Sequence, residues 1–185
     1  MILFRCLAWD RAASPRVRGG PLWFPRMLQG NGRHDNPELY GCLYVSVEPV
    51  SAVAEQIQRL AGTYLEEADL VRRGLPLALA AIEFTENADL LDLDDPGVLV
   101  GEGLRPSQVA TNDRSVTQAG AADIFSRHPE GAGLRWWSTI EALWPNVTLF
   151  DRAEERLAVE DVHPLELGDG IVVEAADYLG LPIST

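Results

Sequence analysis

The spacing of apolar and polar residues predicts a chain that mixes strands with helices. Apolar side chains alternate with other residues over Ile2–Trp9 and again over Gly41–Val47, which is the period of a β-strand. Arg5 lies between Leu3 and Leu7 on one face of the first of these strands. A charge on an apolar face needs a partner or a ligand. Three further strands are predicted over Leu77–Phe84, Leu134–Ser138 and Val147–Phe150.

A helix is predicted from Pro49 to about Gly62, because proline is tolerated in a first helical turn and apolar residues then recur at helical spacing. On a helical wheel, Glu55 lies roughly 150° from the centre of the apolar stripe. That polar side faces either water or a ligand cleft, and the pattern leaves both open. The stripe consists of Val50, Val53, Ala54, Ile57, Leu60 and Ala61.

Weaker patterns predict the other segments. Asp10–Tyr40 is rich in glycine, proline and arginine and has little periodicity, which predicts a long loop. We also expect a short helix over Tyr64–Arg73, a turn-rich connection over Asp92–Thr111 with a short helix beginning at Asp94-Asp95-Pro96, a helix capped by Asn112 or Asp113 and ending near His128, a strand near Ile171–Val173, and a helix over Glu174–Leu179. Strands and helices do not alternate regularly, which favours the α+β class in a single domain over residues 1–185.

The charge of the chain is unevenly distributed. The net charge of −13 argues against direct binding of nucleic acid. Residues 1–33 nevertheless hold six arginines and one aspartate, a charge of +5, which leaves −18 for the remainder. Arginine forks suit phosphate geometry. These arginines therefore either serve an anionic ligand such as a pyrophosphate or pair with the acidic remainder.

Several features indicate a cytoplasmic protein. No apolar run approaches the ~18–20 residues that a membrane helix needs, and the N-terminus does not have the pattern of a secretory signal. Cys6 and Cys42 suit small apolar positions in a reducing compartment, while a nucleophile or metal site is the alternative.

Familiar patterns of metal and nucleotide sites are missing from the sequence. The histidines, His34, His128 and His163, do not have zinc-ligand spacing, and we expect them at the surface. Gly30-Asn31-Gly32-Arg33 is neither a Walker loop nor a Rossmann fingerprint. The cluster of Asp92, Asp94 and Asp95 forms either a solvated turn or a metal site. We expect no metal.

Four short segments resemble one known family. They are Leu3-Phe4-Arg5; Gly30-Asn31-Gly32-Arg33-His34-Asp35-Asn36-Pro37 with the strand over Gly41–Ser46 and the helix start over Glu48–Glu55; Gly133-Leu134-Arg135-Trp136-Trp137-Ser138; and Asn146-Val147-Thr148-Leu149-Phe150. In this order they resemble the RES family, which is named after arginine, glutamate and serine. The resemblance covers residues 3–150, and residues 152–185 are expected to be a C-terminal extension of the same domain.

The resemblance implies a fold related to ADP-ribosyltransferase toxins, a mixed sheet with flanking helices. It implies NAD as substrate, cleaved at the nicotinamide–ribose bond by phosphorolysis or hydrolysis, with free phosphate as a co-substrate in the first case. It also implies a toxin held inactive by an antitoxin partner with a helix-turn-helix (Xre-type) domain. The alternatives are mono-ADP-ribosylation of a protein and, in a different class, a non-catalytic NAD-binding or protein-interaction module. Homo-oligomerisation is left open.

The resemblance also assigns roles to five residues. Glu55 would stabilise the positive charge that develops on the ribose, and Arg5 and Arg33 would bind the pyrophosphate. Tyr44 would stack on nicotinamide, and Ser138 would hydrogen-bond the amide or the ribose. The catalytic set is thus Glu55, Arg33 and Ser138. Each residue also has an ordinary structural role as the alternative: a solvated glutamate, a buried ion pair, an exposed turn arginine, a core tyrosine or a strand-end serine. We expect the five side chains to converge on one pocket.

Overall fold

The computed structural model describes residues 1–85 and 90–184. Contacts within the chain divide it into two compact units. The first unit consists of Met1–Trp23, Val45–Phe84 and Ala158–Thr185, and the second unit consists of Phe24–Tyr44 and Thr85–Leu157. The described residues form eight strands, mainly antiparallel, together with helices, so the α+β class is confirmed. That residues 1–185 are a single domain stays a prediction.

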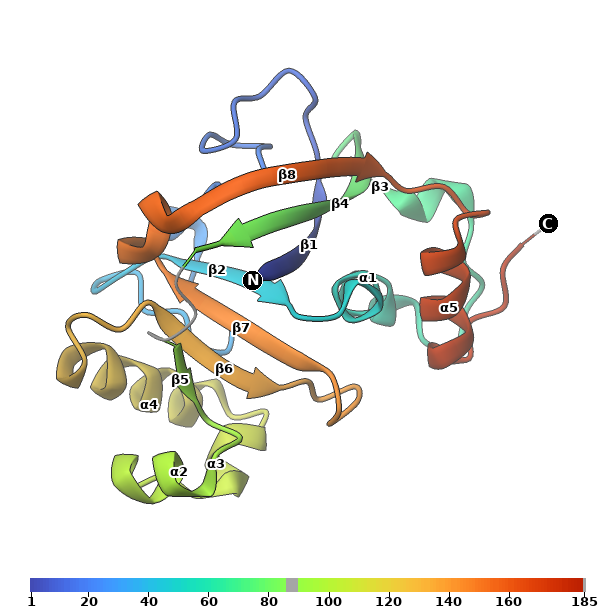
Figure 1. Ribbon diagram of the computed structural model, residues 1–185. Helices are drawn as coiled ribbons and strands as arrows, with labels where there is room; N and C mark the ends of the chain where they lie inside the picture. Colours follow the sequence, from blue (N-terminus) through green and yellow to red (C-terminus); the bar gives the residue numbers. More distant parts are fainter. Residues whose placement is uncertain (86–89, 185) are drawn as a thin grey trace. The chain divides into compact units, whose positions relative to one another are not determined.

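Antiparallel strands make up the sheet of the first unit (Figure 1). β1 (Ile2–Ala8) pairs along its whole length with β4 (Leu75–Phe84). β2 (Cys42–Ser46) pairs with the other side of β1, and the division between the units falls within β2. β3 (Val71–Arg72) and β8 (Leu157–Pro164) both pair with β4. The three strands predicted for this region are confirmed to within two residues at each end.

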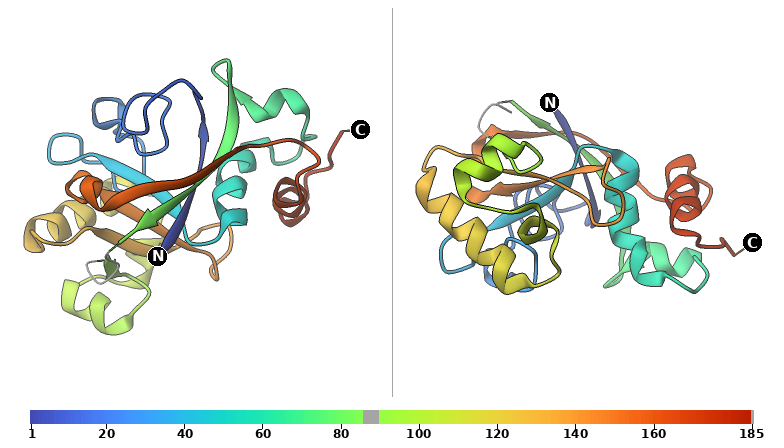
Figure 2. Two further views of the ribbon diagram at one scale, coloured as in Figure 1. Left: turned by 45° about the horizontal axis from the view of Figure 1, so that its top comes forward. Right: turned by 90° about the horizontal axis from the view of Figure 1, so that it is seen from below.

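Two helices of the first unit pack against each other. α1 (Pro49–Ile57) contacts β1 and also lies beside α5 (Gly170–Leu179) (Figure 2). The predicted apolar stripe of α1 is buried as far as Ile57. After Ile57 the chain continues as a 3-10 turn over Gln58–Leu60 and leaves the helix at Gly62, whose φ is +85°. The predicted helix therefore exists, and its last turn has the tighter 3-10 geometry.

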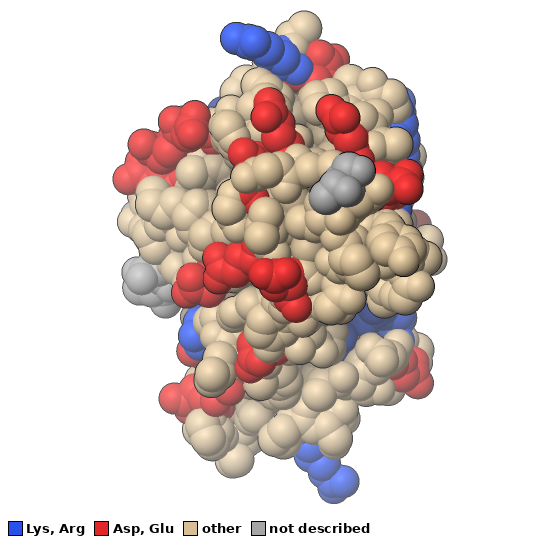
Figure 3. All heavy atoms as spheres, turned by 90° about the vertical axis from the view of Figure 1, so that its right-hand side faces the viewer, with Lys and Arg blue, Asp and Glu red and all other residues tan. Residues whose placement is uncertain are grey.

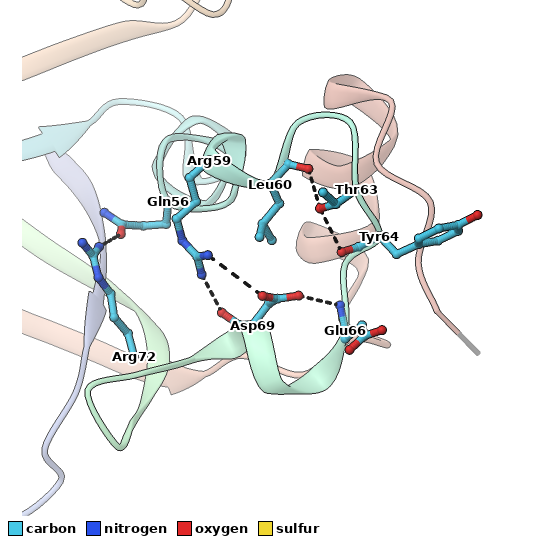
Figure 4. Close-up of polar contacts among 8 residues, drawn as sticks. All are labelled: Gln56, Arg59, Leu60, Thr63, Tyr64, Glu66, Asp69 and Arg72. Atoms are coloured by element: carbon cyan, nitrogen blue, oxygen red, sulfur yellow. Dashed lines mark hydrogen bonds and ion pairs between the residues drawn. The ribbon is translucent and has the colours of Figure 1, made fainter.

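The predicted helix over Tyr64–Arg73 is wrong. This segment holds one 3-10 turn over Glu67–Leu70 and then β3. The Asp69 carboxylate accepts a hydrogen bond of 3.0 Å from the Glu66 backbone N–H, and the Arg59 guanidinium donates one of 3.1 Å to the Asp69 carbonyl (Figure 4). These bonds stabilise a single turn, because the side chains satisfy backbone groups that a longer helix would pair internally.

The tail also differs from its prediction. The strand expected near Ile171–Val173 and the helix expected over Glu174–Leu179 are one helix, α5. Its buried side chains, Val172, Ala175 and Ala176, have helical spacing, and packing against α1 overrides the strand preference of the β-branched run. Residues 157–164, for which no strand was predicted, form β8, whose exposed glutamate and aspartate hide its pattern.

Strands and helices of the second unit enclose its core. β6 (Gly133–Trp137) pairs antiparallel with β7 (Pro145–Phe150) and parallel with β5 (Leu90–Asp92). The predicted strands over Leu134–Ser138 and Val147–Phe150 are confirmed, whereas β5 was not predicted. The helices are α2 (Pro96–Glu102), α3 (Pro106–Ala110) and α4 (Arg114–Arg127), of which α3 was not predicted.

Aspartates begin two of these helices, as the sequence predicted. The Asp95 carboxylate accepts hydrogen bonds from two N–H groups of α2, and Asp113 caps α4 by accepting from the Ser115 N–H at 2.9 Å. Asp92, of the acidic cluster, forms a 2.6 Å ion pair with Arg135. In the described ranges, no three His, Cys, Asp or Glu side chains are grouped to hold a metal ion.

An aromatic cluster lies at the centre of the second unit. The Tyr40 ring lies 4.4 Å from that of Phe125 and 4.6 Å from that of Phe150, centroid to centroid. Both Tyr40 and Phe150 are almost fully buried. Apolar side chains from α2, α3, α4 and β6 pack in the same cluster. This cluster forms the core between the helices and the strands of the second unit.

His34 is buried, so the expectation of a surface histidine is wrong at this position. Its side chain is 3% exposed, and its Nδ1 lies 2.8 Å from the Thr148 hydroxyl. The Trp136 indole N–H donates to the same hydroxyl at 3.0 Å. Burial, together with the charges of Arg33 and Arg114, lowers the pKa of His34 to about 3. The imidazole is therefore neutral at physiological pH.

Both cysteines are free and buried, as expected for small apolar positions. Burial raises the pKa of the Cys6 thiol to about 12, and burial also raises the pKa of Cys42. A thiol held protonated is a poor nucleophile and a poor metal ligand. The structure thus favours the packing role over the reactive one.

The surface reflects the acidic composition. Figure 3 shows a face on which acidic side chains form several groups. None of the described helices is both long enough and apolar enough to cross a membrane.

The aromatic cluster makes a testable prediction about stability. We expect Phe150→Ala to lower the free energy of unfolding by about 3–5 kcal/mol, because it removes a buried ring and leaves a cavity. Leu143→Ala, whose side chain is 85% exposed, is the control and should change it by less than about 0.5 kcal/mol. Urea titration monitored by circular dichroism measures both. Equal effects of the two substitutions would contradict the assignment of this core.

The lowered pKa of His34 predicts how the stability of the fold depends on pH. The folded chain has a His34 pKa of about 3, against 6.5 in an unfolded chain, so only the unfolded state gains the proton between these values. The contribution of His34 to the free energy of unfolding is therefore complete above pH about 6.5. It decreases as the pH falls toward 3, at most by about 1.4 kcal/mol per pH unit. His34→Leu should flatten this part of the stability–pH curve.

The control for the pH prediction is Trp136→Phe, which removes the hydrogen bond to Thr148 and keeps the imidazole. It should lower the free energy of unfolding at every pH and leave the slope between pH 4 and 6 as in the wild type. Urea midpoints measured across this range provide the comparison. An unchanged slope in His34→Leu would show that His34 is not the titrating group.

Candidate functional site

One carboxylate organises the glycine-rich turn of the second unit. Asp35 is 5% exposed. Its Oδ2 accepts hydrogen bonds from the backbone N–H groups of Gly30 at 2.8 Å and Gly32 at 2.7 Å. Its Oδ1 accepts a third, of 2.7 Å, from the Tyr44 hydroxyl. Asp35 thus joins the turn to β2, the strand that follows it.

Gly32 has no room for a side chain. A Cβ at this position would lie 2.5 Å from Asp35 Oδ1 and 2.6 Å from the Tyr44 hydroxyl oxygen. Both atoms belong to the hydrogen bond just described, so neither can move without breaking it. The close approach of the turn to Tyr44 therefore requires glycine here.

The Tyr44 hydroxyl is held on two sides. It donates to Asp35 and accepts a hydrogen bond of 2.9 Å from the His34 backbone N–H. Burial raises the pKa of Tyr44 well above its usual range, and the nearby Cys42 and Asp35 raise it further. The phenol therefore stays protonated and acts as a hydrogen-bond donor. Its ring is half-buried on β2 and stacks at 6.5 Å, centroid to centroid, with the His34 imidazole.

Arg33 projects from the same turn into the second unit. It is 5% exposed, so the alternative of an exposed turn arginine is wrong. Its Nη1 donates hydrogen bonds of 2.8 Å to the carbonyls of Val109 and Thr111, at the end of α3. Its guanidinium carbon lies 4.9 Å from the centre of the Trp136 ring, within cation–π range. Trp136 is itself buried.

Helix α4 holds the turn from its other side. The Thr117 hydroxyl donates to the Arg33 carbonyl at 2.6 Å. The Gln118 amide donates to the carbonyls of Gly30 at 3.1 Å and Gly32 at 2.9 Å. Together with Asp35, these side chains satisfy backbone groups that the irregular turn cannot pair by itself.

Ser138 follows β6 and is buried. Its Oγ accepts a hydrogen bond of 3.1 Å from the Ile140 backbone N–H. This is the strand-end arrangement named above as the structural alternative.

The remaining two candidates belong to the first unit. Arg5 is half-buried on β1, and its Nη1 donates to the carbonyls of Pro21 at 2.6 Å and Trp23 at 3.3 Å. Burial lowers the pKa of Arg5 to about 10, so the guanidinium is charged at neutral pH. Glu55 is half-buried on α1, and its Oε2 accepts a hydrogen bond of 2.7 Å from the Gln58 amide.

The structure thus distributes the five predicted residues between the units, Arg5 and Glu55 in the first and Arg33, Tyr44 and Ser138 in the second. Hydrogen bonds through the glycine-rich turn connect the segments of Arg33 and Tyr44 directly. The convergence of all five on one pocket stays a prediction. Sequence reasoning missed Asp35, although an aspartate that follows a glycine-rich turn often accepts from its backbone.

The described residues of the second unit line cavities, of which none shown lies at the predicted set as a whole. A cavity of about 350 Å³ lies at the end of α4, beside Leu90, His128 and Phe150, and none of the five predicted residues lines it. A smaller cavity of about 20 Å³ is lined by His34 and Thr117 among other residues. That volume suffices for one water molecule.

Chemically, these residues offer two kinds of interaction. Arg5 and Arg33 are charged donors held by backbone carbonyls, which suits the binding of a phosphate group. Tyr44 presents an aromatic ring fixed by its hydroxyl, and Glu55 presents a carboxylate.

Comparisons with known proteins show the fold and the family of this chain. A solved structure, the crystal structure of the M. tuberculosis MbcT-MbcA toxin-antitoxin complex, matches with a TM-score of 0.58 and 19% sequence identity. The match covers 97% of this chain and 87% of that chain. At this identity the likeness shows a shared fold. The comparison with curated proteins gave no match.

The family comparison covers more of the chain than the resemblance did. The RES domain model matches residues 3–168. It therefore includes β8 and the segment after it, which had been expected to lie outside the resemblance. All five predicted residues and Asp35 fall within the matched range. Because the match spans far more than half of the chain, this protein belongs to the RES domain family.

Proposed function

We propose that this protein cleaves the bond between nicotinamide and ribose in NAD. The observation that carries the proposal is the RES family match over residues 3–168, which contains each residue to which the family chemistry assigns a role. Support also comes from the buried Arg33 and the fixed Tyr44, whose hydrogen bonds hold a cation and an aromatic ring on one turn and its neighbouring strand.

The proposed reaction breaks the C1′–N1 glycosidic bond. The bonding electrons stay on the pyridine nitrogen and neutralise its positive charge, so nicotinamide leaves as a neutral molecule. The ribose then carries positive charge shared between C1′ and the ring oxygen. Attack by water gives ADP-ribose and a proton, and attack by phosphate gives ADP-ribose 1″-phosphate.

In this proposal the residues of the first unit act on the ribose and the pyrophosphate. The Glu55 carboxylate stabilises the cationic ribose and holds its hydroxyls, a role for a negative charge placed before the transition state forms. Arg5 donates to pyrophosphate oxygens. It is held by the neutral carbonyls of Pro21 and Trp23, so these contacts do not neutralise its charge.

The residues of the second unit act on nicotinamide and the phosphates. Arg33 is the second phosphate-binding cation, Tyr44 stacks on the nicotinamide ring, and Ser138 hydrogen-bonds the carboxamide or the ribose. The Tyr44 hydroxyl is already hydrogen-bonded to Asp35 and His34. In this proposal Tyr44 therefore contacts nicotinamide through the face of its ring and not through its hydroxyl.

We further propose that the protein is the toxin of a toxin–antitoxin pair. The MbcT-MbcA complex, to which the chain is similar in fold, is described as a toxin-antitoxin complex. The RES resemblance assigns a helix-turn-helix protein as the antitoxin. Co-purification with the product of an adjacent gene, together with loss of NAD cleavage in the complex, would support this partner.

An assay with NAD tests the proposed function. Purified protein is incubated with NAD with and without phosphate, and released nicotinamide is measured by chromatography. We expect nicotinamide in both the phosphorolytic and the hydrolytic case, with phosphate dependence only in the first. Labelled ADP-ribose on protein would instead indicate transfer. Measurable NAD binding without turnover would contradict the proposal and favour a non-catalytic module.

Glu55→Gln tests the key carboxylate. Glutamine keeps the shape of the side chain and its capacity to accept from Gln58, and it removes the charge. We expect nicotinamide release to slow by on the order of 10²–10³, as for other groups that stabilise transition-state charge. The rate constant kcat from initial rates is the measurement.

The matched control is Glu67→Gln, which changes the same charge at an exposed position of the first unit. It should retain the wild-type kcat. A wild-type kcat in Glu55→Gln would remove Glu55 from the catalytic set, and an equal loss in both variants would attribute the effect to net charge.

A further inference from the structure

We infer that Asp35 is a positioning residue of this site, holding the Tyr44 ring and the turn that carries Arg33 in one arrangement. The inference rests on the proposed function, since the arrangement matters only if Tyr44 and Arg33 contact NAD. It assigns to Asp35 a role that acts through Tyr44 and requires no contact between Asp35 and the substrate.

The three hydrogen bonds of Asp35 explain why this residue is an aspartate. All described donors to the carboxylate are neutral: two backbone N–H groups and the Tyr44 hydroxyl. An asparagine could accept from the two N–H groups through its carbonyl oxygen, but its amide nitrogen would then face the tyrosine hydroxyl. Only a carboxylate accepts on both sides at once.

The bonds of Asp35 fix the direction of the Tyr44 ring. A tyrosine side chain has two rotatable bonds, and a hydroxyl held both by Asp35 and by the His34 N–H leaves a single orientation. A ring that stacks on a substrate must be parallel to it before the substrate binds, so this orientation contributes directly to binding.

The same bonds fix the backbone on both sides of Arg33. Gly32 precedes it and donates to Asp35, and His34 follows it and donates to Tyr44. Displacement of Asp35 would release both neighbours at once. The cation and the aromatic ring are therefore held by one network rather than independently.

The test uses Asp35→Asn, Tyr44→Phe and the double variant. Asp35→Asn keeps an acceptor for the turn and removes the acceptor for the phenol. We expect kcat/KM for nicotinamide release to fall about ten- to hundredfold in Asp35→Asn, the range for a hydrogen bond to a charged group. If Asp35 acts through Tyr44, the double variant should be no slower than the slower single variant. Multiplied losses in the double variant would overturn the inference.

Gln118→Ala controls for simple loss of stability. Gln118 donates to the carbonyls of Gly30 and Gly32, so its removal loosens the same turn without touching Tyr44. Assays are run at a temperature equally far below the melting midpoint of each variant. We expect Gln118→Ala to retain kcat/KM within about threefold under these conditions. A loss as large as that of Asp35→Asn would mean that the turn matters only for stability.

A spectroscopic readout separates this inference from the proposed function. In protein with ¹³C-labelled tyrosine, the Cζ resonance of Tyr44, assigned with Tyr44→Phe, reports the hydrogen bond of its hydroxyl. It should shift in Asp35→Asn and stay in place in Gln118→Ala. An unchanged resonance in Asp35→Asn overturns the inference, whether or not the wild type cleaves NAD. If the wild type releases no nicotinamide, the proposed function is wrong. The Tyr44 resonance then still tests whether Asp35 holds the Tyr44 hydroxyl.

Discussion

A carboxylate taken out of water must find a donor for each oxygen it no longer exposes, and the second unit meets this requirement at Asp35 with two peptide N–H groups and one phenol. These hydrogen bonds determine the structure around Asp35. They bring the turn so close to β2 that a Cβ at Gly32 has no space. They also leave the glycine-rich segment ordered without regular secondary structure. What looks in sequence like a loop is thus a rigid connection.

The two arginines with assigned roles are held in similar ways. Arg5 donates to the carbonyls of Pro21 and Trp23, and Arg33 donates to those of Val109 and Thr111. A carbonyl fixes the direction of a guanidinium without cancelling its charge, whereas a carboxylate would neutralise it. The carbonyls that hold Arg5 therefore leave its positive charge in place. Arg26 differs, because its guanidinium lies 3.6 Å from the Asp151 carboxylate.

The spacing of apolar and polar residues was sufficient to predict the structure of segments that depend on few distant contacts. The strand over Ile2–Trp9 and the aspartate cap at Asp113 follow from alternation and from capping chemistry, and both were predicted. Prediction failed where contacts with distant residues determine the secondary structure of a segment. The Ile171–Val173 run is helical because α1 packs against it, and Asp69 stops a helix with the help of Arg59. The family resemblance supplied the candidate site residues, but the contact that holds the buried His34 comes from Thr148, which lies far away in the sequence.

The order of segments in the first unit has a consequence for biosynthesis. Its sheet and helix pair are completed by β8 and α5, which pair with β4 and α1 although they come from the far end of the sequence. During translation, β1 and β4 leave the ribosome long before those partners exist. The nascent chain therefore cannot pair β8 with β4 or pack α5 against α1 until residues 158–185 have emerged. The fold of the first unit is thus completed only after these residues have been synthesised.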